Sequence, residues 1–423
     1  MDIEDPNRKT PAKKRGRPPS PELELKDLQG FKFFERIKGL FSTLHDCAAH
    51  PNRELFFDEY ATTVLFYFFN PAITSLNDLQ QATDFEKVQK ALGIRRMSQG
   101  SMSESVRVFD PALVAKVFQE RAAGAAERAC DPRLKDLRQV LTVVDGTLLR
   151  ALPRMTWAVW LGDRERGVRA HVHFEVVKQT AVRVYLTPGS GPENECLKMH
   201  LEPGRLYVLD RGFRDFRLYQ EIVQADSSFV ARLGDNAVYE VLQENALTPE
   251  AQAAGVISDR IVRLGVRQVR KKFDRPVRLV DVTVEEKARR GLGYAVKQVD
   301  PKTKSCREPV GKAFTLRVAT DRLDLPADVI ALIYLHRQKV ELFFRFLKAV
   351  LGCRHLLSDS MKGISVQVYC ALIATLLLAE YTGLAPSKRT FTLVVLYLQG
   401  WVQDHEFVRE ITKLKEKVAS KKP

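Results

Sequence analysis

The sequence is poor in cysteine and lacks a long, uninterrupted apolar run. Its six cysteines include no C-x-x-C pair, which argues against a zinc site and a disulfide framework and favours a reducing cytosol. The longest apolar stretch, Val368–Ala379, is too short to span a bilayer and predicts a packed helix. We find no signal peptide after Met1, no lipidation signal and no basic amphipathic arm. These absences predict a cytoplasmic protein with no membrane partner.

Histidine also lacks a metal-ligand pattern. The chain has eight histidines, and the two that lie closest together, His171 and His173, flank Val172. Side chains two residues apart lie on one face of a strand. The pair therefore predicts a core strand rather than a metal site.

Negative charges are outnumbered by positive ones. The chain has 67 Lys and Arg residues against 52 Asp and Glu residues, for a net charge of +15 at pH 7, and its pI is about 9.5. This balance favours a polyanionic partner, which we interpret as nucleic acid. With 423 residues, the chain has room for two or three domains with sizeable cores.

Residues 1–26 are polar, charged and proline-rich, which predicts a disordered basic arm. The arm contains the AT-hook-like run Lys13-Lys14-Arg15-Gly16-Arg17-Pro18-Pro19. A thin ribbon with Arg15 and Arg17 can enter a narrow A·T minor groove, where the negative potential attracts guanidinium groups. The alternative is a generic basic arm without sequence preference.

Residues 27–132 have mainly helical patterns. The amphipathic run Leu76–Leu92 predicts a helix that ends at Gly93. A serine-rich turn is expected at Ser98–Ser105, and another helix from about Pro111 to Arg128.

Two aspartates have matching surroundings. Asp145 follows the apolar run Val140–Val144, and Asp210 follows Leu206–Leu209. Such runs, bounded by glycine, predict buried strands with an Asp at the strand end. A single Asp in this position is more often a turn-former or a helix N-cap, so the pair is more informative than either residue alone.

The segment Ala331–Lys348 predicts a helix with one polar stripe, because four side chains follow one another at offsets of three, four and seven. These side chains are Tyr334, Arg337, Glu341 and Lys348. The opposite stripe is apolar and should face a core; it comprises Phe343, Phe346, Leu347, Val350 and Leu351. A solvated helix face with i, i+4 ion pairs would look similar.

The two aspartates change this interpretation. Three carboxylates that converge repel one another, and at least one protonates unless a cation is bound. Oxygen ligands and phosphate suit Mg²⁺. Asp145, Asp210 and Glu341 together therefore point to two-metal phosphoryl transfer.

These residues resemble those of the DDE transposases of bacterial insertion sequences, and specifically of the insertion-sequence-four family. The family pattern Y-x2-R-x3-E-x6-K is matched by Tyr334, Arg337, Glu341 and Lys348. The block VVDGTLLRALPRMTWAVW around the first Asp and the block YVLDRGFRDFRLY around the second also resemble family blocks. The likeness covers roughly residues 133–378.

The resemblance implies an α/β fold, in which a ribonuclease-H-like catalytic core is interrupted by a β-rich insertion and preceded by an α-helical N-terminal domain. It implies that Asp145, Asp210 and Glu341 are catalytic and hold two Mg²⁺ ions, for which Mn²⁺ substitutes. Tyr334 and the cations Arg337 and Lys348 would contact the terminal nucleotides. The partners would be double-stranded DNA at the element ends and the target, with a homodimer assembled on DNA in the bacterial nucleoid.

The resulting domain prediction has six parts. They are the arm 1–26, a helical DNA-binding domain 27–132, the first part of the core 133–234, the β-rich insertion 235–320, the second part of the core 321–385, and a helical, basic tail 386–423. Plain helical packing remains an alternative to DNA binding over residues 27–132. The insertion contains a basic stripe, which would either clamp DNA phosphates or form a solvated sheet face: Arg260, Arg263, Arg267, Arg270, Lys271, Lys272, Arg275 and Arg278.

The function predicted is that of a transposase, which binds the terminal inverted repeats of its element and catalyses Mg²⁺-dependent cleavage and strand transfer. One alternative is a domesticated DNA-binding protein that has lost the chemistry. The other is a nuclease without strand transfer, which would share the metal site.

Overall fold

The computed structural model describes residues 31–47, 54–128, 130–151, 159–160, 166–189, 192–265, 273, 275–285, 313–349, 357–358 and 360–420. The predicted N-terminal arm with Arg15 and Arg17 lies outside these ranges. The helices are α1 (Phe31–Ile37), the 3-10 helix η2 (Ser42–Leu44), α2 (Phe57–Phe68), α3 (Leu76–Ala82), α4 (Glu86–Leu92), α5 (Gln99–Val108), α6 (Pro111–Ala123), α7 (Pro132–Lys135), α8 (Glu193–Met199), α9 (Phe216–Gln224), α10 (Pro249–Ala253), α12 (Ala327–Leu335), α13 (Gln338–Ala349), α14 (Met361–Thr382), α15 (Lys388–Leu398) and α16 (Asp404–Ala419). The strands are β1 (Val140–Ala151), β2 (Val159–Trp160), β3 (Arg166–Glu175), β4 (Thr180–Pro188), β5 (Arg205–Leu209), β6 (Ser228–Arg232), β7 (Tyr239–Glu244), β8 (Val256–Leu264), β9 (Val277–Glu285) and β10 (Ala313–Thr320).

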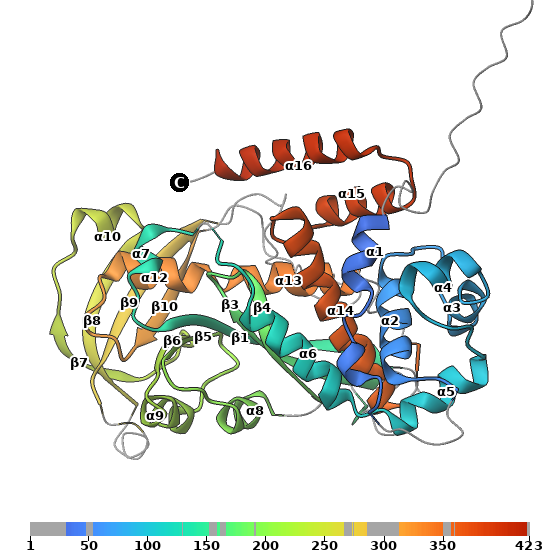
Figure 1. Ribbon diagram of the computed structural model, residues 1–423. Helices are drawn as coiled ribbons and strands as arrows, with labels where there is room; N and C mark the ends of the chain where they lie inside the picture. Colours follow the sequence, from blue (N-terminus) through green and yellow to red (C-terminus); the bar gives the residue numbers. More distant parts are fainter. Residues whose placement is uncertain are drawn as a thin grey trace, which may run out of the picture.

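Within the described ranges, ten strands form one mixed sheet in the order β2-β3-β1-β5-β6-β10-β9-β8-β7, and β4 pairs with β3 (Figure 1). The neighbours β1, β5 and β6 are parallel, which fits their short apolar runs, because parallel strands are usually buried on both faces. The remaining pairings are antiparallel. The strands of the segment predicted as an insertion, 235–320, therefore continue the same sheet, because β10 pairs with β6.

Helices cover both faces of the sheet (Figure 1). On one face, α8 and α9 pack over a cluster in which the ring of Tyr219 stacks on that of Phe229, with 4.4 Å between the ring centroids. On the other face, α12 packs against β6, β8, β9 and β10, and α13 packs against β1. The ring centroids of Phe343 on α13 and Phe174 on β3 are 5.6 Å apart. Complete burial of such a side chain contributes roughly 1.5–3 kcal/mol.

The N-terminal helices pack against α14, from the other end of the described chain (Figure 1). Tyr369 of α14 lies near Phe118 of α6, and its hydroxyl donates to the carbonyl of Val184 on β4 at 2.9 Å. By length and composition α14 could cross a membrane, yet 89% of its most apolar window is buried inside this fold. It is therefore a core helix, as the sequence predicts for Val368–Ala379.

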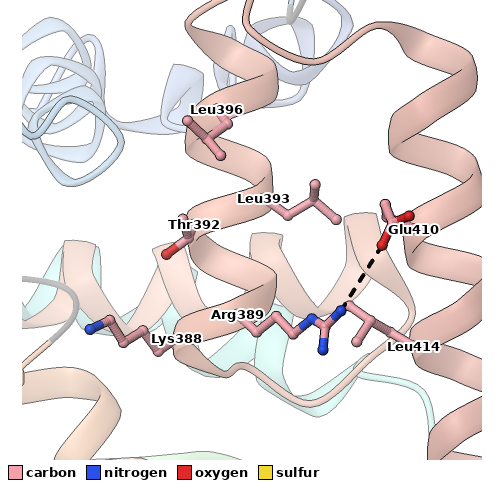
Figure 2. A pocket seen from close by; sticks show the side chains of 7 residues that line it. All are labelled: Lys388, Arg389, Thr392, Leu393, Leu396, Glu410 and Leu414. Carbon is pink, nitrogen blue, oxygen red and sulfur yellow. Dashed lines mark ion pairs between the residues drawn. The ribbon is translucent and has the colours of Figure 1, made fainter.

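The C-terminal helices α15 and α16 lie side by side (Figure 1). A hollow of about 460 Å³ lies between them. Arg389 and Glu410 are among its lining residues and form an ion pair with 4.0 Å between the charged atoms (Figure 2). Leucine side chains make up much of its lining. None of the three predicted catalytic carboxylates lines this hollow, so it has no part in the chemistry discussed below.

Three predictions for the N-terminal helices are wrong in detail. The helix expected over Leu76–Leu92 is divided into α3 and α4, and at the junction the N–H groups of Thr83, Asp84 and Phe85 donate to carbonyls three residues back. The segment Ser98–Ser105 is the beginning of α5 rather than a turn, with Ser98 as the N-cap. The helix expected to reach Arg128 ends at Ala123, before Gly124.

The helix predicted over Ala331–Lys348 is also divided, into α12 and α13. At the junction, the N–H of Arg337 donates to the carbonyl of Tyr334, and the N–H of Val340 donates to that of Arg337, both three residues back. Such bonds tighten a helix locally. Three residues of the predicted apolar stripe, Phe343, Phe346 and Leu347, are buried as expected, while Val350 and Leu351 lie outside the described residues.

Candidate active site

Asp145 and Asp210 lie level with each other on neighbouring strands. In the parallel register of β1 and β5, Val143 pairs with Val208, and each Asp comes two residues later. Each carboxylate accepts a hydrogen bond from a nearby glycine N–H: Gly146 to Asp145 at 2.8 Å and Gly212 to Asp210 at 2.7 Å. The register of the sheet therefore brings two residues that are 65 positions apart side by side.

The prediction that Asp145 ends its strand is wrong. Strand β1 continues to Ala151, because it pairs with the antiparallel β3 along its whole second half. Gly146 pairs with His171 within this ladder and does not interrupt it. Asp210, in contrast, directly follows the last residue of β5, as predicted.

Arg337 connects the helical part of the site to β1. Its guanidinium lies 3.4 Å from the carboxylate of Asp145 and forms a close ion pair with Glu341. The side chains of Arg337, Asp145 and Glu341 are 8%, 16% and 25% exposed. Such pairs are screened less by water than surface pairs are. The structure thus brings Glu341 of α13 and Asp145 of β1 to a shared cation.

The pKa of Asp145 is shifted in the direction expected where several carboxylates lie close together. Burial raises the pKa of the Asp145 carboxyl to about 7, and the negative charge of Asp210 adds to this rise. Arg337 and the Gly146 N–H act in the opposite direction, while Glu193 raises the pKa further. A bound cation would relieve this repulsion.

Glu193, the first residue of α8, is a member of this site that sequence reasoning missed. A Cβ atom added at Gly146 would lie 2.5 Å from one oxygen of Glu193, and one added at Gly212 would lie 3.2 Å from the other. The two glycines thus leave room for this carboxylate, which also forms a close ion pair with Arg169. Acidic residues are common in the first turn of a helix, so the sequence carried no specific signal for Glu193.

Of the other two residues of the predicted polar stripe, Tyr334 departs from the prediction and Lys348 does not. Tyr334 is 2% exposed and so does not present its phenol to solvent, because α12 packs on the sheet. Lys348 is half-buried and lies two turns after Glu341 on α13, which places both on the same side of that helix.

Part of the predicted basic stripe has a structural role. Arg260 forms a close ion pair with Asp281, and Arg278 lies 2.6 Å from Asp259. Both aspartates are buried. Neither of the alternatives predicted, a phosphate clamp or a solvated face, describes these two arginines. Arg275 is exposed and Arg263 half-buried, while the rest of the stripe, Arg267, Arg270, Lys271 and Lys272, lies outside the described residues.

The carboxylates are not arranged as a ready-made metal shell. In the part of the chain that the structure describes, no three Asp, Glu, His or Cys side chains are grouped closely enough to hold an ion. Arg337 lies between Asp145 and Glu341. The donors themselves are all carboxylate oxygens, the type that Mg²⁺ prefers, and the crowded charge at Asp145 favours a cation. The residues therefore fit a hard divalent ion in their chemistry, provided that Arg337 gives way.

Comparisons with known proteins return transposases. The family model described as "Transposase DDE domain" matches residues 136–377, more than half of the chain. A "Putative transposase y4zB" of Sinorhizobium fredii (strain NBRC 101917 / NGR234) is 25% identical over 243 residues, which are 57% of this chain and 60% of that protein. A "Probable transposase for insertion sequence element IS5377" of Geobacillus stearothermophilus is 27% identical over 244 residues, 56% of this chain and 55% of that protein. The matched stretch thus spans less than two thirds of either relative.

One solved structure aligns with most of the chain. It is described as "Cryo-EM structure of piggyBac transposase synaptic complex with hairpin DNA", and the alignment covers 90% of this chain and 84% of that one. The sequence identity is 10% and the TM-score is 0.38. A likeness at this level carries no argument about fold or function.

Proposed function

The chain belongs to the family of transposase DDE domains, and on this premise we propose that it is a DNA transposase of the insertion-sequence-four type. It would bind the terminal inverted repeats of its own element, cut the DNA there and join the freed 3′ ends to a target. The matched family region, residues 136–377, coincides closely with the stretch in which the motifs occur. Double-stranded DNA is the partner that the net charge of +15 also favours.

The observation that carries this proposal is the alignment of Asp145 and Asp210 on adjacent parallel strands, with Glu341 linked to Asp145 through Arg337. We propose that these three carboxylates are catalytic. The strand order β4-β3-β1-β5-β6 supports a ribonuclease-H-like core, in which β1 and β5 carry the two aspartates. The segment 235–320 would be the insertion, although its strands extend the core sheet.

Asp145, Asp210 and Glu341 would hold two Mg²⁺ ions, or Mn²⁺ in their place. When bound, such ions lower the pKa of an attacking water or 3′-hydroxyl and stabilise the leaving oxygen. The protein itself contributes orientation: the sheet fixes Asp145 and Asp210, and Gly146 and Gly212 N–H groups hold their carboxylates. All steps are displacements at phosphorus, so one site serves both cleavage and joining.

The remaining contacts follow from the same proposal. Arg337 and Lys348 would grip phosphates beside the scissile one, and Tyr334 would support that part of the site. The helical segment 27–132 would bind the inverted repeats, with Arg15 and Arg17 of the arm 1–26 adding minor-groove or phosphate contacts. The protein would assemble on DNA as a homodimer, in the cytoplasm at the nucleoid. Residues 386–423 would form a helical, basic tail.

A plasmid assay separates the alternatives. The purified protein is incubated with Mg²⁺ and a supercoiled plasmid that carries both ends of the element. Integration products support the transposase, and cuts without joining indicate a nuclease. A plasmid that is shifted on a gel but not cut indicates a DNA-binding protein that has lost the chemistry. The same reaction in excess chelator tests the metal requirement.

A further inference from the structure

A second charged hollow, separate from the carboxylates, lies beside Asp210. It has a volume of about 370 Å³, and three arginines are part of its lining. The lining residues are Arg211, Arg232, Asp235, Phe314, Thr315 and Arg317. Asp235 is the single carboxylate among them. We call this hollow the three-arginine pocket.

The sheet register fixes where this pocket lies. In the parallel pairing of β5 and β6, Leu209 pairs with Ala231, so Asp210 and Arg232 come next on the two strands. By this register, the positions of Asp145 in β1, Asp210 directly after β5 and Arg232 in β6 follow one another across the sheet. Arg317 comes from β10, which pairs with β6 on its far side. Strands lie about 4.8 Å apart, which places the backbones of Arg232 and Arg317 roughly 5 and 10 Å from that of Asp210.

The charge of the pocket is only partly balanced. Arg211 pairs with Asp235 at 2.7 Å, but the Asp235 side chain is 77% exposed. Arg317 donates to Asp281, which lies outside the lining, at 3.0 Å. The buried Nε atoms of Arg211 and Arg232 have no hydrogen-bond acceptor in the part of the chain that the structure describes. Buried donors without acceptors are costly, and an anion would supply acceptors.

The chemistry of the pocket selects a phosphate group. A guanidinium is a planar fork that matches phosphate oxygens and stays charged at any ordinary pH, and the hydroxyl of Thr315 adds a further donor. One strand of duplex DNA presents a phosphate about every 3.4 Å along the axis. Adjacent phosphates of one strand lie farther apart than this axial rise, so a strand whose scissile phosphate lies at Asp145 and Asp210 would place the phosphate of a neighbouring nucleotide in this region.

We propose that the three-arginine pocket binds a backbone phosphate of the DNA strand that enters the carboxylate site, and so sets how far the strand advances. This inference rests on the proposed function. Arg211, Arg232 and Arg317 act as positioning residues, because they hold the strand and do not contact the reacting atoms. Free inorganic phosphate offers the same chemistry and is the competing source.

The test compares Arg232→Gln with the exposed control Arg409→Gln on α16 in the full-length protein. Binding to a short fluorescent DNA duplex is measured against salt concentration without divalent ions. Loss of one phosphate contact should lower the slope of log K against log salt by about 0.9 in Arg232→Gln and leave it unchanged in Arg409→Gln. Arg211→Gln is a second variant. The Arg211 side chain is 38% exposed in the wild type, so its replacement should not impair folding. Thermal melting verifies that both variants are folded.

Two further outcomes are informative. If both pocket variants keep the wild-type slope while the wild type binds and cuts DNA, the pocket proposal is wrong and the proposed function stands. If the wild type binds no DNA at all, the proposed function itself fails. Another outcome is that millimolar inorganic phosphate raises the melting temperature of the wild type but not that of Arg232→Gln, while the salt dependence of DNA binding is the same in both. That result would assign the pocket to a free anion and overturn the proposal.

Discussion

Arg337 contacts Asp145 and Glu341 at the same time, at 3.4 Å and in a close ion pair, so a cation of the protein lies between two of the three predicted catalytic carboxylates. It neutralises part of the charge that a metal ion would otherwise neutralise. The residue that we expect to hold a DNA phosphate is thus also a competitor of the metal. We expect bound DNA to draw Arg337 towards a phosphate and so to free the carboxylates.

Arg337→Gln should therefore separate two properties. Affinity for Mn²⁺ or Ca²⁺ without DNA should rise, because the competing guanidinium is gone. Cleavage at saturating DNA should fall roughly 10-fold or more, because the strand is no longer held in line. Isothermal titration with the ion gives the first value and single-turnover kinetics the second. Lys348→Gln is the matched control for the ion: its affinity should stay at the wild-type value, and an unchanged affinity in Arg337→Gln would contradict the competition.

Arg278 should matter for stability. Its loss in Arg278→Ala leaves Asp259, which is 4% exposed, without its cation at 2.6 Å, and the free energy of unfolding should fall by roughly 3 kcal/mol. The exposed neighbour Arg275 is the control, since Arg275→Ala should change stability by less than about 0.5 kcal/mol. Urea unfolding measures both. A loss of DNA affinity in Arg278→Ala at unchanged stability would restore the phosphate-clamp interpretation.

Gly146→Ala should displace Glu193 from the site. The added Cβ would lie 2.5 Å from a Glu193 oxygen, so this carboxylate must leave its position beside Arg169. Crowding of this kind costs about 1–3 kcal/mol, and cleavage should fall more than DNA binding does. Gly100→Ala, where a Cβ meets its nearest atom at 3.9 Å, should be nearly neutral. Removal of the carboxylate in Gly146→Ala/Glu193→Ala should recover the stability; failure to do so would show that the crowding involves something else.

Buried histidines should make the protein sensitive to mild acid. Burial lowers the pKa of His173 to about 3 and the pKa values of His171 and His336 to about 4, against an ordinary value of about 6.5 in the unfolded chain. The unfolded state therefore binds more protons between about pH 6.5 and 4. In this window the free energy of unfolding should decrease as the pH falls, by about 1.4 kcal/mol per pH unit for each such histidine.

Replacement of one of these groups tests the assignment. His173→Phe should flatten the decrease in stability between about pH 6.5 and 4, because one proton-linked group is removed while a ring still packs beside Tyr185 and Tyr207. The exposed His405→Gln is the control and should leave the slope unchanged. Equal slopes for all three proteins in urea titrations would show that His173 does not carry the effect.

The parts of the site that the sequence predicted well are those set by local pattern. Apolar runs before Asp145 and Asp210 predicted the strands that lead to both residues, and the spacing of Phe343, Phe346 and Leu347 predicted the buried side of α13, which the structure confirms. Strand spacing also placed His171 and His173 in the core. Sequence periodicity predicts these features because it depends only on the geometry of a single helix or strand.

The parts that the sequence could not predict depend on contacts between elements. No Pro or Gly marks the junction of α12 and α13, so the pattern gave one helix and an exposed Tyr334 where packing gives two helices and a buried ring. Glu193 reaches the site because two glycines leave space for it, a relation across three elements. The charge of Arg260 is taken up by Asp281 on another strand, which composition alone cannot show.

We propose Asp145, Asp210 and Glu341 as the catalytic carboxylates of a DNA transposase. The most direct measurement is strand transfer from a supercoiled plasmid with paired element ends, for Asp145→Asn, Asp210→Asn and Glu341→Gln beside the wild type and the surface control Glu410→Gln. We predict joined products with Mg²⁺ for the wild type and the control, and none for the three variants, all of which still retard the plasmid. Substantial strand transfer by any of the three variants would contradict the assignment.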